Sequence, residues 1–265
     1  MKFDIVAHSM GGLIARYYLR YGDQELENAA INWAGSENVD RLLLIAPPNF
    51  GSMKSLIGAN DGYQGHSLLP RYSGAILSSF PSTYQLFPRD RHEKVVNDQG
   101  EPISIYNANL WKQNKWGFFN PQNTESLAAL LPDNSIEERE SIALEFLENC
   151  LNRAEQFHAA LDSNATQPDE LKVYLFSGDT IPTPEKIAAH SPNKENFAFE
   201  VIDWSPGDDT VTRSSSLSVE RSHYGPVNFA ATYFVAADHF ALTRNGLIFE
   251  GLINTLMEKP GLNQP

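Results

Sequence analysis

Blocks of apolar and polar residues at the start of the chain predict a strand, a helix and a second strand. Residues 3–6 lie in a short apolar, partly β-branched run that is typical of a buried strand. From Gly11 the apolar positions recur with helical spacing as far as Gly22, which is a helix stop signal. Residues 39–48, VDRLLLIAPP, form another buried-strand pattern that two prolines close. This order predicts two parallel strands joined by a right-handed helical crossover.

The second half of the chain predicts further strands after a long helix. Ser135 and Glu138 form an S-x-x-E capping box, and the apolar stripe that follows predicts a helix through Leu161. Strands are predicted at 172–178, 197–203 and 229–238, and a closing helix is predicted at 240–257. The pattern is that of an α/β protein with a mostly parallel sheet.

Residues 51–132 interrupt this alternation. They are rich in Gly, Pro, Ser, Asn and aromatic residues and show no clean period, which predicts short helices and loops. The chain contains no internal repeat, low-complexity tract or interdomain linker. We therefore interpret residues 1–265 as one α/β domain, with a cap or lid inserted at approximately 51–170.

Composition narrows the classes of function. The formal charge of −13 argues against a nucleic-acid partner, and no basic amphipathic segment predicts attraction to anionic lipid. No apolar run approaches the roughly 18 residues that span a bilayer, and the N-terminus does not resemble a signal peptide. We expect a soluble protein, cytoplasmic by default, with no cofactor and no metal. Cys150 is the only cysteine, so we expect no internal disulfide and a small buried side chain.

The serine between the first strand and the first helix is the main candidate for chemistry. Ser9 in A-H-S-M-G occupies the place of the serine in a G-x-S-x-G nucleophile elbow, with Ala7 in place of the first glycine and Gly11 as the second. Small residues at these two positions let the helix approach the strand closely. The backbone N–H of Met10, at the helix N-terminus, is the predicted oxyanion donor. The alternative is a structural serine that caps the helix.

A serine hydroxyl needs a base to remove its proton, and His239 is the preferred candidate. It directly follows the last predicted strand, and in enzymes with this elbow the chain order is serine, acid, histidine. His8 is expected to point away from the substrate side, and His158 to make an interhelical contact from the long helix. The other histidines are expected to be solvent-exposed loop residues: His66, His92, His190 and His223.

The acid that fixes the histidine tautomer has two leading candidates by position. Asp208 stands with Asp209 in the turn SPGDDTVT before the last strand, and Asp179 closes an earlier strand. Asp203 lies within a predicted strand and Asp238 directly precedes the histidine, so both fit less well. Position alone does not separate Asp179 from Asp208.

Several segments together resemble the lecithin:cholesterol acyltransferase family of α/β-hydrolases. They are DIVAHSMGGLIARYYL, IAPPNFGS, FPSTYQLFP, VYLFSGDTIPT, GDDTVTRSS and DHFALTRN, and they keep the order of the family over most of the chain. In that family the acid is the first aspartate of a D-G-T-V or D-D-T-V turn, so the resemblance selects Asp208 and implies that Thr210 braces the turn. It also implies a membrane-facing cap, whose aromatic residues we expect to form its core and, as a set, to line an acyl-chain channel.

The chain departs from the family pattern in two further ways. The insertion lacks the cysteines of a disulfide-closed lid, which indicates a bacterial-type relative. Members of this fold place four strands before the nucleophile strand, and the loop after the third supplies a second oxyanion N–H. We expect these N-terminal strands to be missing here, which would leave the edge of the first strand unpaired.

Together these residues predict a serine-dependent lipid O-acyltransferase, lipase or phospholipase. Ser9, His239 and Asp208 would act on an acyl lipid or another ester through an acyl-enzyme, and the cap would contact the lipid interface. Two alternatives stay open. One is a catalytically inactive fragment of such an enzyme, and the other is a hydrolase of small esters or amides, which would not need the aromatic insertion.

Overall fold

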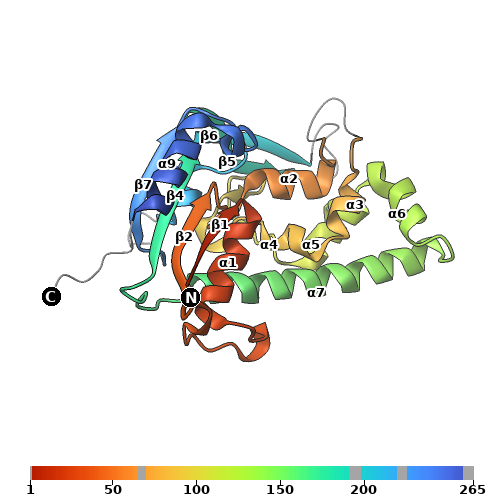
Figure 1. Ribbon diagram of the computed structural model, residues 1–265. Coiled ribbons are helices and arrows are strands. Elements are labelled where there is room, and N and C mark those ends of the chain that lie inside the picture. The colour runs from red at the N-terminus through yellow and green to blue at the C-terminus, as the bar shows by residue number, and fades with distance from the viewer. Residues whose placement is uncertain (1, 65–69, 191–197, 220–225, 259–265) are drawn as a thin grey trace. The chain divides into compact units, whose positions relative to one another are not determined.

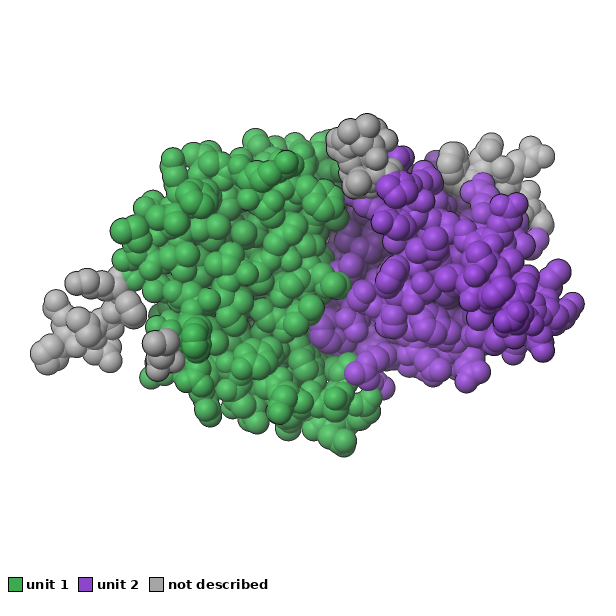
Figure 2. All heavy atoms as spheres, turned by 45° about the vertical axis from the view of Figure 1, so that its right-hand side comes forward, with its two compact units in different colours: residues 1–50, 159–183, 205–265 green, residues 51–158, 184–204 purple. Residues whose placement is uncertain are grey.

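The computed structural model describes residues 2–64, 70–190, 198–219 and 226–258. The chain divides into two compact units, coloured separately in Figure 2. The first unit comprises Met1–Phe50, Ala159–Thr183 and Ser205–Pro265, and the second comprises Gly51–His158 and Pro184–Trp204. Each unit has hydrophobic clusters of its own.

The first unit is built on a four-stranded parallel sheet with the strand order β1-β2-β4-β7 (Figure 1). The strands are β1 (Phe3–His8), β2 (Val39–Ile45), β4 (Lys172–Gly178) and β7 (Phe229–Val235). Its helices are α1 (Met10–Tyr21), α8 (Arg213–Leu217) and α9 (Gly246–Met257), with the 3₁₀ helices η1 (Leu26–Asn28), η2 (Ala34–Ser36) and η6 (Ala241–Arg244). The predicted strands that form this sheet, and the helix after the first of them, are confirmed.

Helices cover both faces of this sheet, and strand β2 shows why its sequence is continuously apolar. Leu42 and Leu44 belong to the cluster that includes residues of α1, whereas Leu43 and Ile45 belong to the cluster that includes Ile248 of α9. Successive strand residues point to opposite faces, so a parallel strand covered on both sides needs apolar residues at every position.

The second unit is mainly helical. It contains α2 (Met53–Asp61), α3 (Gly74–Ser78), α4 (Pro81–Gln85), α5 (Ala108–Gln113), α6 (Thr124–Leu130), most of α7 (Ile136–Asp162), and the 3₁₀ helices η3 (Asp90–His92), η4 (Gly117–Phe119) and η5 (Pro121–Asn123). The expected short helices and loops of 51–132 are thus confirmed. Across the described ranges, no helix has both the length and the apolar content needed to cross a bilayer.

The long helix α7 begins at the predicted capping box. The Ser135 hydroxyl oxygen accepts the Glu138 backbone N–H at 3.2 Å, and the Ser135 backbone N–H donates to the Glu138 carboxylate at 2.7 Å. These two bonds satisfy amide groups that the first turn of a helix leaves without partners.

Most of the large aromatic residues in 51–132 form the core of the second unit. Tyr84, Phe87, Trp111 and Trp116 are fully buried. Phe87 stacks on Trp111 with ring centroids 5.8 Å apart, and Trp116 packs at 5.0 Å from Phe199. The expectation of an aromatic core is confirmed for these residues, whereas three others are exposed: Tyr63, Tyr72 and Phe80.

Two strands differ from the sequence prediction. The strand predicted at 197–203 is β6 (Phe199–Gly207), and it belongs to a second sheet with the order β3-β5-β6 rather than to the main sheet; residue 197 lies outside the described residues. Its partners are β3 (Val95–Val96) and β5 (Ile181–Ala189). The sequence does not predict β5, because it contains Pro182 and Pro184 and proline disfavours a strand. The strand forms because both prolines precede the residues that pair with β3.

Candidate active site

Ser9 occupies a strained turn between β1 and α1. Its φ is 54° and its ψ is −126°, in a region that residues with a Cβ atom rarely adopt. The Ser9 backbone N–H donates to the Ile45 carbonyl at 2.8 Å, and its own carbonyl accepts the Gly12 N–H at 2.9 Å. The turn is therefore tied to β2 on one side and to α1 on the other. Met10 begins α1, where an N–H has no acceptor within the helix.

The close approach of α1 to the sheet depends on Gly12. A Cβ atom added there would lie 2.8 Å from Leu44 Cδ2 and 3.0 Å from Pro47 Cβ. A Cβ atom added at Gly11 would meet only the Cβ of Ala7, at an ordinary 3.8 Å. Alanine at position 7 therefore fits the turn, and the tightest approach lies one residue beyond the position that the sequence motif indicates.

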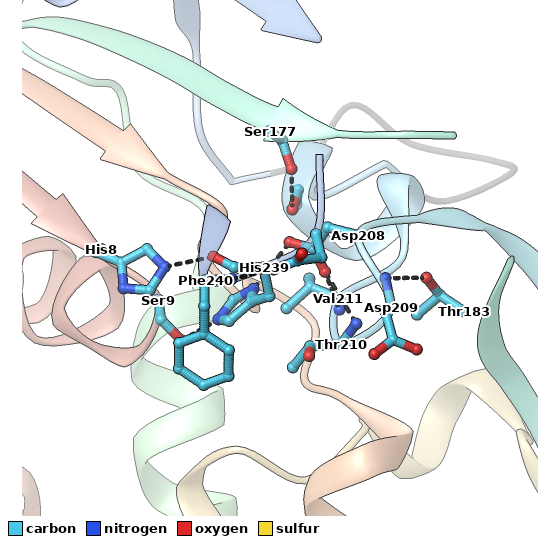
Figure 3. A network of polar contacts seen from close by, with 12 residues as sticks. His8, Ser9, Ser177, Thr183, Asp208, Asp209, Thr210, Val211, His239 and Phe240 are labelled. Atoms are coloured by element: carbon cyan, nitrogen blue, oxygen red, sulfur yellow. Dashed lines mark hydrogen bonds and ion pairs between the residues drawn. The ribbon is translucent and has the colours of Figure 1, made fainter. Parts of the chain in front are cut away.

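Hydrogen bonds connect Ser9, His239 and Asp208 in a continuous chain (Figure 3). His239 Nε2 lies 2.8 Å from Ser9 Oγ, and His239 Nδ1 lies 2.8 Å from Asp208 Oδ2. Asp208 is 0% exposed and His239 is 4% exposed. Because a carboxylate only accepts, Nδ1 carries the proton, and neutral His239 then presents an unprotonated Nε2 to the serine hydroxyl.

The turn that contains Asp208 holds its carboxylate in one orientation. Asp208 Oδ1 accepts the backbone N–H groups of Thr210 at 3.0 Å and Val211 at 2.7 Å. The His239 backbone N–H donates to the Asp208 carbonyl at 2.9 Å. Gly178 at the end of β4 leaves space for this turn, because a Cβ atom added there would lie 2.9 Å from Asp208 Cβ. Thr210 thus supports the turn through its backbone.

The other candidate aspartates have different contacts. Asp179 pairs with Arg213 at 2.9 Å. Asp238 Oδ1 accepts the backbone N–H groups of the two residues that follow His239, at 3.1 and 2.9 Å. Asp203 Oδ1 accepts the N–H of the next residue at 2.9 Å, and the backbone N–H of Asp209 donates to Thr183 Oγ1 at 2.9 Å. The carboxylate in contact with the His239 ring is that of Asp208.

His8 lies beside His239, a contact that the motif did not indicate. Its Nε2 donates to the His239 carbonyl at 3.1 Å, and the two ring centroids are 4.9 Å apart. Burial, and secondly the charge of protonated His239, lower the pKa of His8 below its ordinary value. His8 thus favours the neutral form in the folded protein.

The remaining histidines lie in the second unit or outside the described residues. His158 of α7 contacts Tyr106 at 3.0 Å and the carbonyl of Gln85 in α4 at 2.8 Å, which confirms the interhelical contact. His190 lies between the carboxylates of Asp98 and Glu200 at 2.7 and 2.9 Å, so the expectation of a solvent-exposed side chain is wrong. The expectation is also wrong for His92, which is half-buried in η3. Outside the described residues lie His66 and His223.

Phe240 adds an apolar surface next to His239. Phe240 is 52% exposed, and its ring meets the imidazole edge-on, with ring centroids 5.6 Å apart and an interplanar angle of 86°. Figure 3 shows the ring beside Ser9 and His239. Among the described residues, no group of three or more His, Cys, Asp or Glu side chains could hold a metal ion.

The parallel sheet covered on both faces, with a serine at the turn between strand and helix, defines an α/β-hydrolase fold. The chain belongs to the lecithin:cholesterol acyltransferase family, which matches residues 1–212. No curated protein matches the sequence.

Solved structures match the chain over nearly its whole length. One is the crystal structure of the Tle4–Tli4 complex, with a TM-score of 0.64 and 15% identity, where the match covers 98% of this chain and 60% of the other. Another is lipase 1 from Pelosinus fermentans, with a TM-score of 0.41 and 14% identity, covering 97% of this chain and 72% of the other. The chain therefore spans 60% of the length of its match in the Tle4–Tli4 complex.

Proposed function

We propose that the chain performs serine-dependent acyl transfer from lipid esters, as a lipid O-acyltransferase, a lipase or a phospholipase. The observation that carries the proposal is the hydrogen-bonded chain from Ser9 Oγ through His239 to the buried carboxylate of Asp208. Membership of the lecithin:cholesterol acyltransferase family supports an acyl lipid as the substrate.

In the proposed mechanism Ser9 is the nucleophile. Its Oγ attacks the ester carbonyl while His239 Nε2 accepts the hydroxyl proton, and Asp208 stabilises the resulting imidazolium. The carbonyl oxygen becomes an oxyanion, to which the Met10 N–H donates. Collapse of this intermediate breaks the bond to the leaving alcohol, which takes its proton from Nε2. An alcohol or a water molecule then attacks the acyl-enzyme carbonyl while His239 Nε2 accepts its proton. Collapse of this second intermediate breaks the bond to Ser9 Oγ, which takes the proton back from Nε2.

We further propose that the second unit acts as the cap of this site and contacts the lipid interface. The exposed rings of Tyr63, Tyr72 and Phe80 supply apolar surface for such contact. The formal charge of −13 opposes attraction to anionic lipid, so the contact would depend on apolar side chains.

A fluorophosphonate probe tests the nucleophile directly, because it forms a covalent bond with an activated serine. We expect labelling of the wild-type chain and of Ser36→Ala, but not of Ser9→Ala. Ser36 is a suitable control because it lies in the first unit and its hydroxyl donates to the Trp33 carbonyl, away from His239. Absence of labelling in the wild-type chain would favour the inactive fragment over the enzyme.

Substrate assays separate the remaining alternatives. A lipid enzyme should turn over long-chain phospholipid or acylglycerol in vesicles or micelles, whereas a small-ester hydrolase should prefer acetyl esters and be inactive on the aggregated lipid. Adding a lipid alcohol and measuring new ester against free fatty acid distinguishes transfer from hydrolysis.

A further inference from the structure

A buried polar side chain connects α1, which begins next to Ser9, with α8, which follows the turn of Asp208. Asn49 lies in the segment after β2 and is 0% exposed. Its Oδ1 accepts a hydrogen bond from Arg16 Nη1 at 2.8 Å, and its Nδ2 donates to the Ser216 carbonyl at 2.7 Å. One amide side chain thus acts as acceptor toward one helix and as donor toward the other.

Arg16, which bonds to Asn49 on one side, is held in place within α1. Arg16 follows Ser9 by about two turns of α1, so the two residues share a face of the helix. Arg16 is 4% exposed, and its Nη2 also donates to the Leu161 carbonyl at 2.8 Å. A buried guanidinium with such fixed acceptors has little freedom to follow a shift of Asn49.

Ser216, which bonds to Asn49 on the other side, is held in α8 close to the turn of Asp208. Thr212 caps the N-terminus of α8 and forms an isolated β-bridge with Gly207, so the turn of Asp208 lies between these two bridged residues. Ser216 lies in α8, and its hydroxyl accepts a hydrogen bond from Ser177 Oγ of β4 at 3.0 Å. Displacing α8 would therefore displace the C-terminal side of the turn that aims the Asp208 carboxylate at His239.

We propose that Asn49 is a positioning residue, which keeps the Asp208 turn in register with the helix that follows Ser9. The inference rests on the proposed function for its catalytic meaning. Asn49 bonds to Arg16 of α1 and to Ser216 of α8, so its effect passes through α8 to the turn of Asp208 and the Asp208–His239 contact. An alanine at this position removes both bonds and leaves a buried N–H and a buried C=O without that partner.

An NMR resonance of His239 tests the proposal whether or not the chain is active. The chemical shift of the His239 Hδ1 proton reports the hydrogen bond that Nδ1 donates to Asp208 Oδ2. Asp208→Asn should move this resonance upfield, because a neutral amide oxygen is a weaker acceptor than a carboxylate. Asn49→Ala should move it in the same direction by less, and adding Asn49→Ala to Asp208→Asn should move it no further.

Asn60→Ala is the matched control. Asn60 is as buried as Asn49, at 1% exposure, and its side chain accepts the Gly117 N–H at 2.9 Å, but it lies in the second unit. We expect this variant to lose stability without moving the His239 Hδ1 resonance. In the wild-type background, we expect Asn49→Ala to slow fluorophosphonate labelling of Ser9 by about 10- to 100-fold, the effect of a small misplacement of reacting groups.

Two results would overturn the positioning role. One is an unchanged His239 Hδ1 resonance in a folded Asn49→Ala variant, and the other is an equal displacement of that resonance with and without Asp208→Asn. If Asn49→Ala does not fold, Ser177→Ala decides instead. It removes the bond from Ser177 Oγ to Ser216 in α8 and should move the resonance in the same direction by less, so an unmoved resonance would refute the proposal. A wild-type chain that never labels refutes the proposed function, while the NMR measurement still tests the positioning role.

Discussion

Replacing Ser9 by glycine should give a more stable protein than replacing it by alanine, although both variants lose the proposed nucleophile. The backbone at Ser9, with φ 54° and ψ −126°, lies in a sparsely populated region. A residue with a Cβ atom is held there at a cost of about 1–3 kcal/mol. Glycine adopts positive φ without that steric cost, whereas alanine retains it.

The expected difference follows from the contacts of the turn. Both variants remove the 2.8 Å bond between Ser9 Oγ and His239 Nε2, so its contribution of about 0.5–1.5 kcal/mol cancels in the comparison. Glycine relieves the strain and so stabilises the folded chain by about 1–3 kcal/mol, but it lowers stability by about 0.5–1 kcal/mol because the unfolded chain has greater freedom. The net gain is about 1 kcal/mol, or a rise in Tm of about 2–4 °C for a chain of this size.

Thermal unfolding by calorimetry measures this difference, with a matched pair at Ser214 as the control. Ser214 lies within helix α8 of the same unit, where glycine should be less stable than alanine by about 0.5–1 kcal/mol. The sign of the glycine–alanine difference should therefore reverse between the two serines. If Ser9→Gly were less stable than Ser9→Ala while the Ser214 pair behaved as expected, the turn at Ser9 would not be strained.

Three further predictions concern other residues of the chain. The pKa of His8 in the folded protein lies below its ordinary 6.5, so the stability that neutral His8 contributes is complete above about pH 6.5 and is lost as the pH falls through the folded-state pKa. Between neutral and acidic pH, the urea midpoint should therefore fall less in His8→Gln than in the wild-type chain. An identical fall in both proteins would contradict this. Burial raises the pKa of Cys150 to about 11, so a disulfide reagent at pH 8 should modify it only when denaturant unfolds the chain, and rapid reaction of the native protein would be the opposing result. Phe240→Ala should lower kcat/KM for a long-chain ester about tenfold more than for an acetyl ester, because the exposed ring beside His239 offers an apolar contact to the acyl chain. Equal losses of kcat/KM on both esters would exclude this contact.

The aspartate that contacts His239 shows where local patterns stop being sufficient. Local patterns and chain order predict the serine and the histidine, but Asp179 and Asp208 each lie beside a strand where an acid would fit. The structure separates them by contact, since Asp179 pairs with Arg213 and Asp208 bonds to the His239 ring. In the sequence, only the family resemblance favours Asp208 over Asp179.

Three features cannot be predicted from the sequence for a related reason: the strand β5, the sheet to which β6 belongs, and the contacts of the Asn49 side chain. Nothing in the pattern near 197–203 indicates which sheet its strand joins, and Asn49 in PPNFG looks like any polar residue of a turn. Its importance comes from Arg16 and Ser216, which are distant in sequence and meet only in the folded chain.

Local sequence specifies the strands of the main sheet, the long helix and the turn at Ser9, because these depend on residues close together along the chain. Apolar runs, helical spacing, a capping box and the small residues around the serine act through neighbouring backbone and side-chain groups. The tertiary structure decided which strands share a sheet, which carboxylate meets His239, and which buried amide connects the helices beside them. Those outcomes depend on distant segments packing together, and no local pattern contains that information.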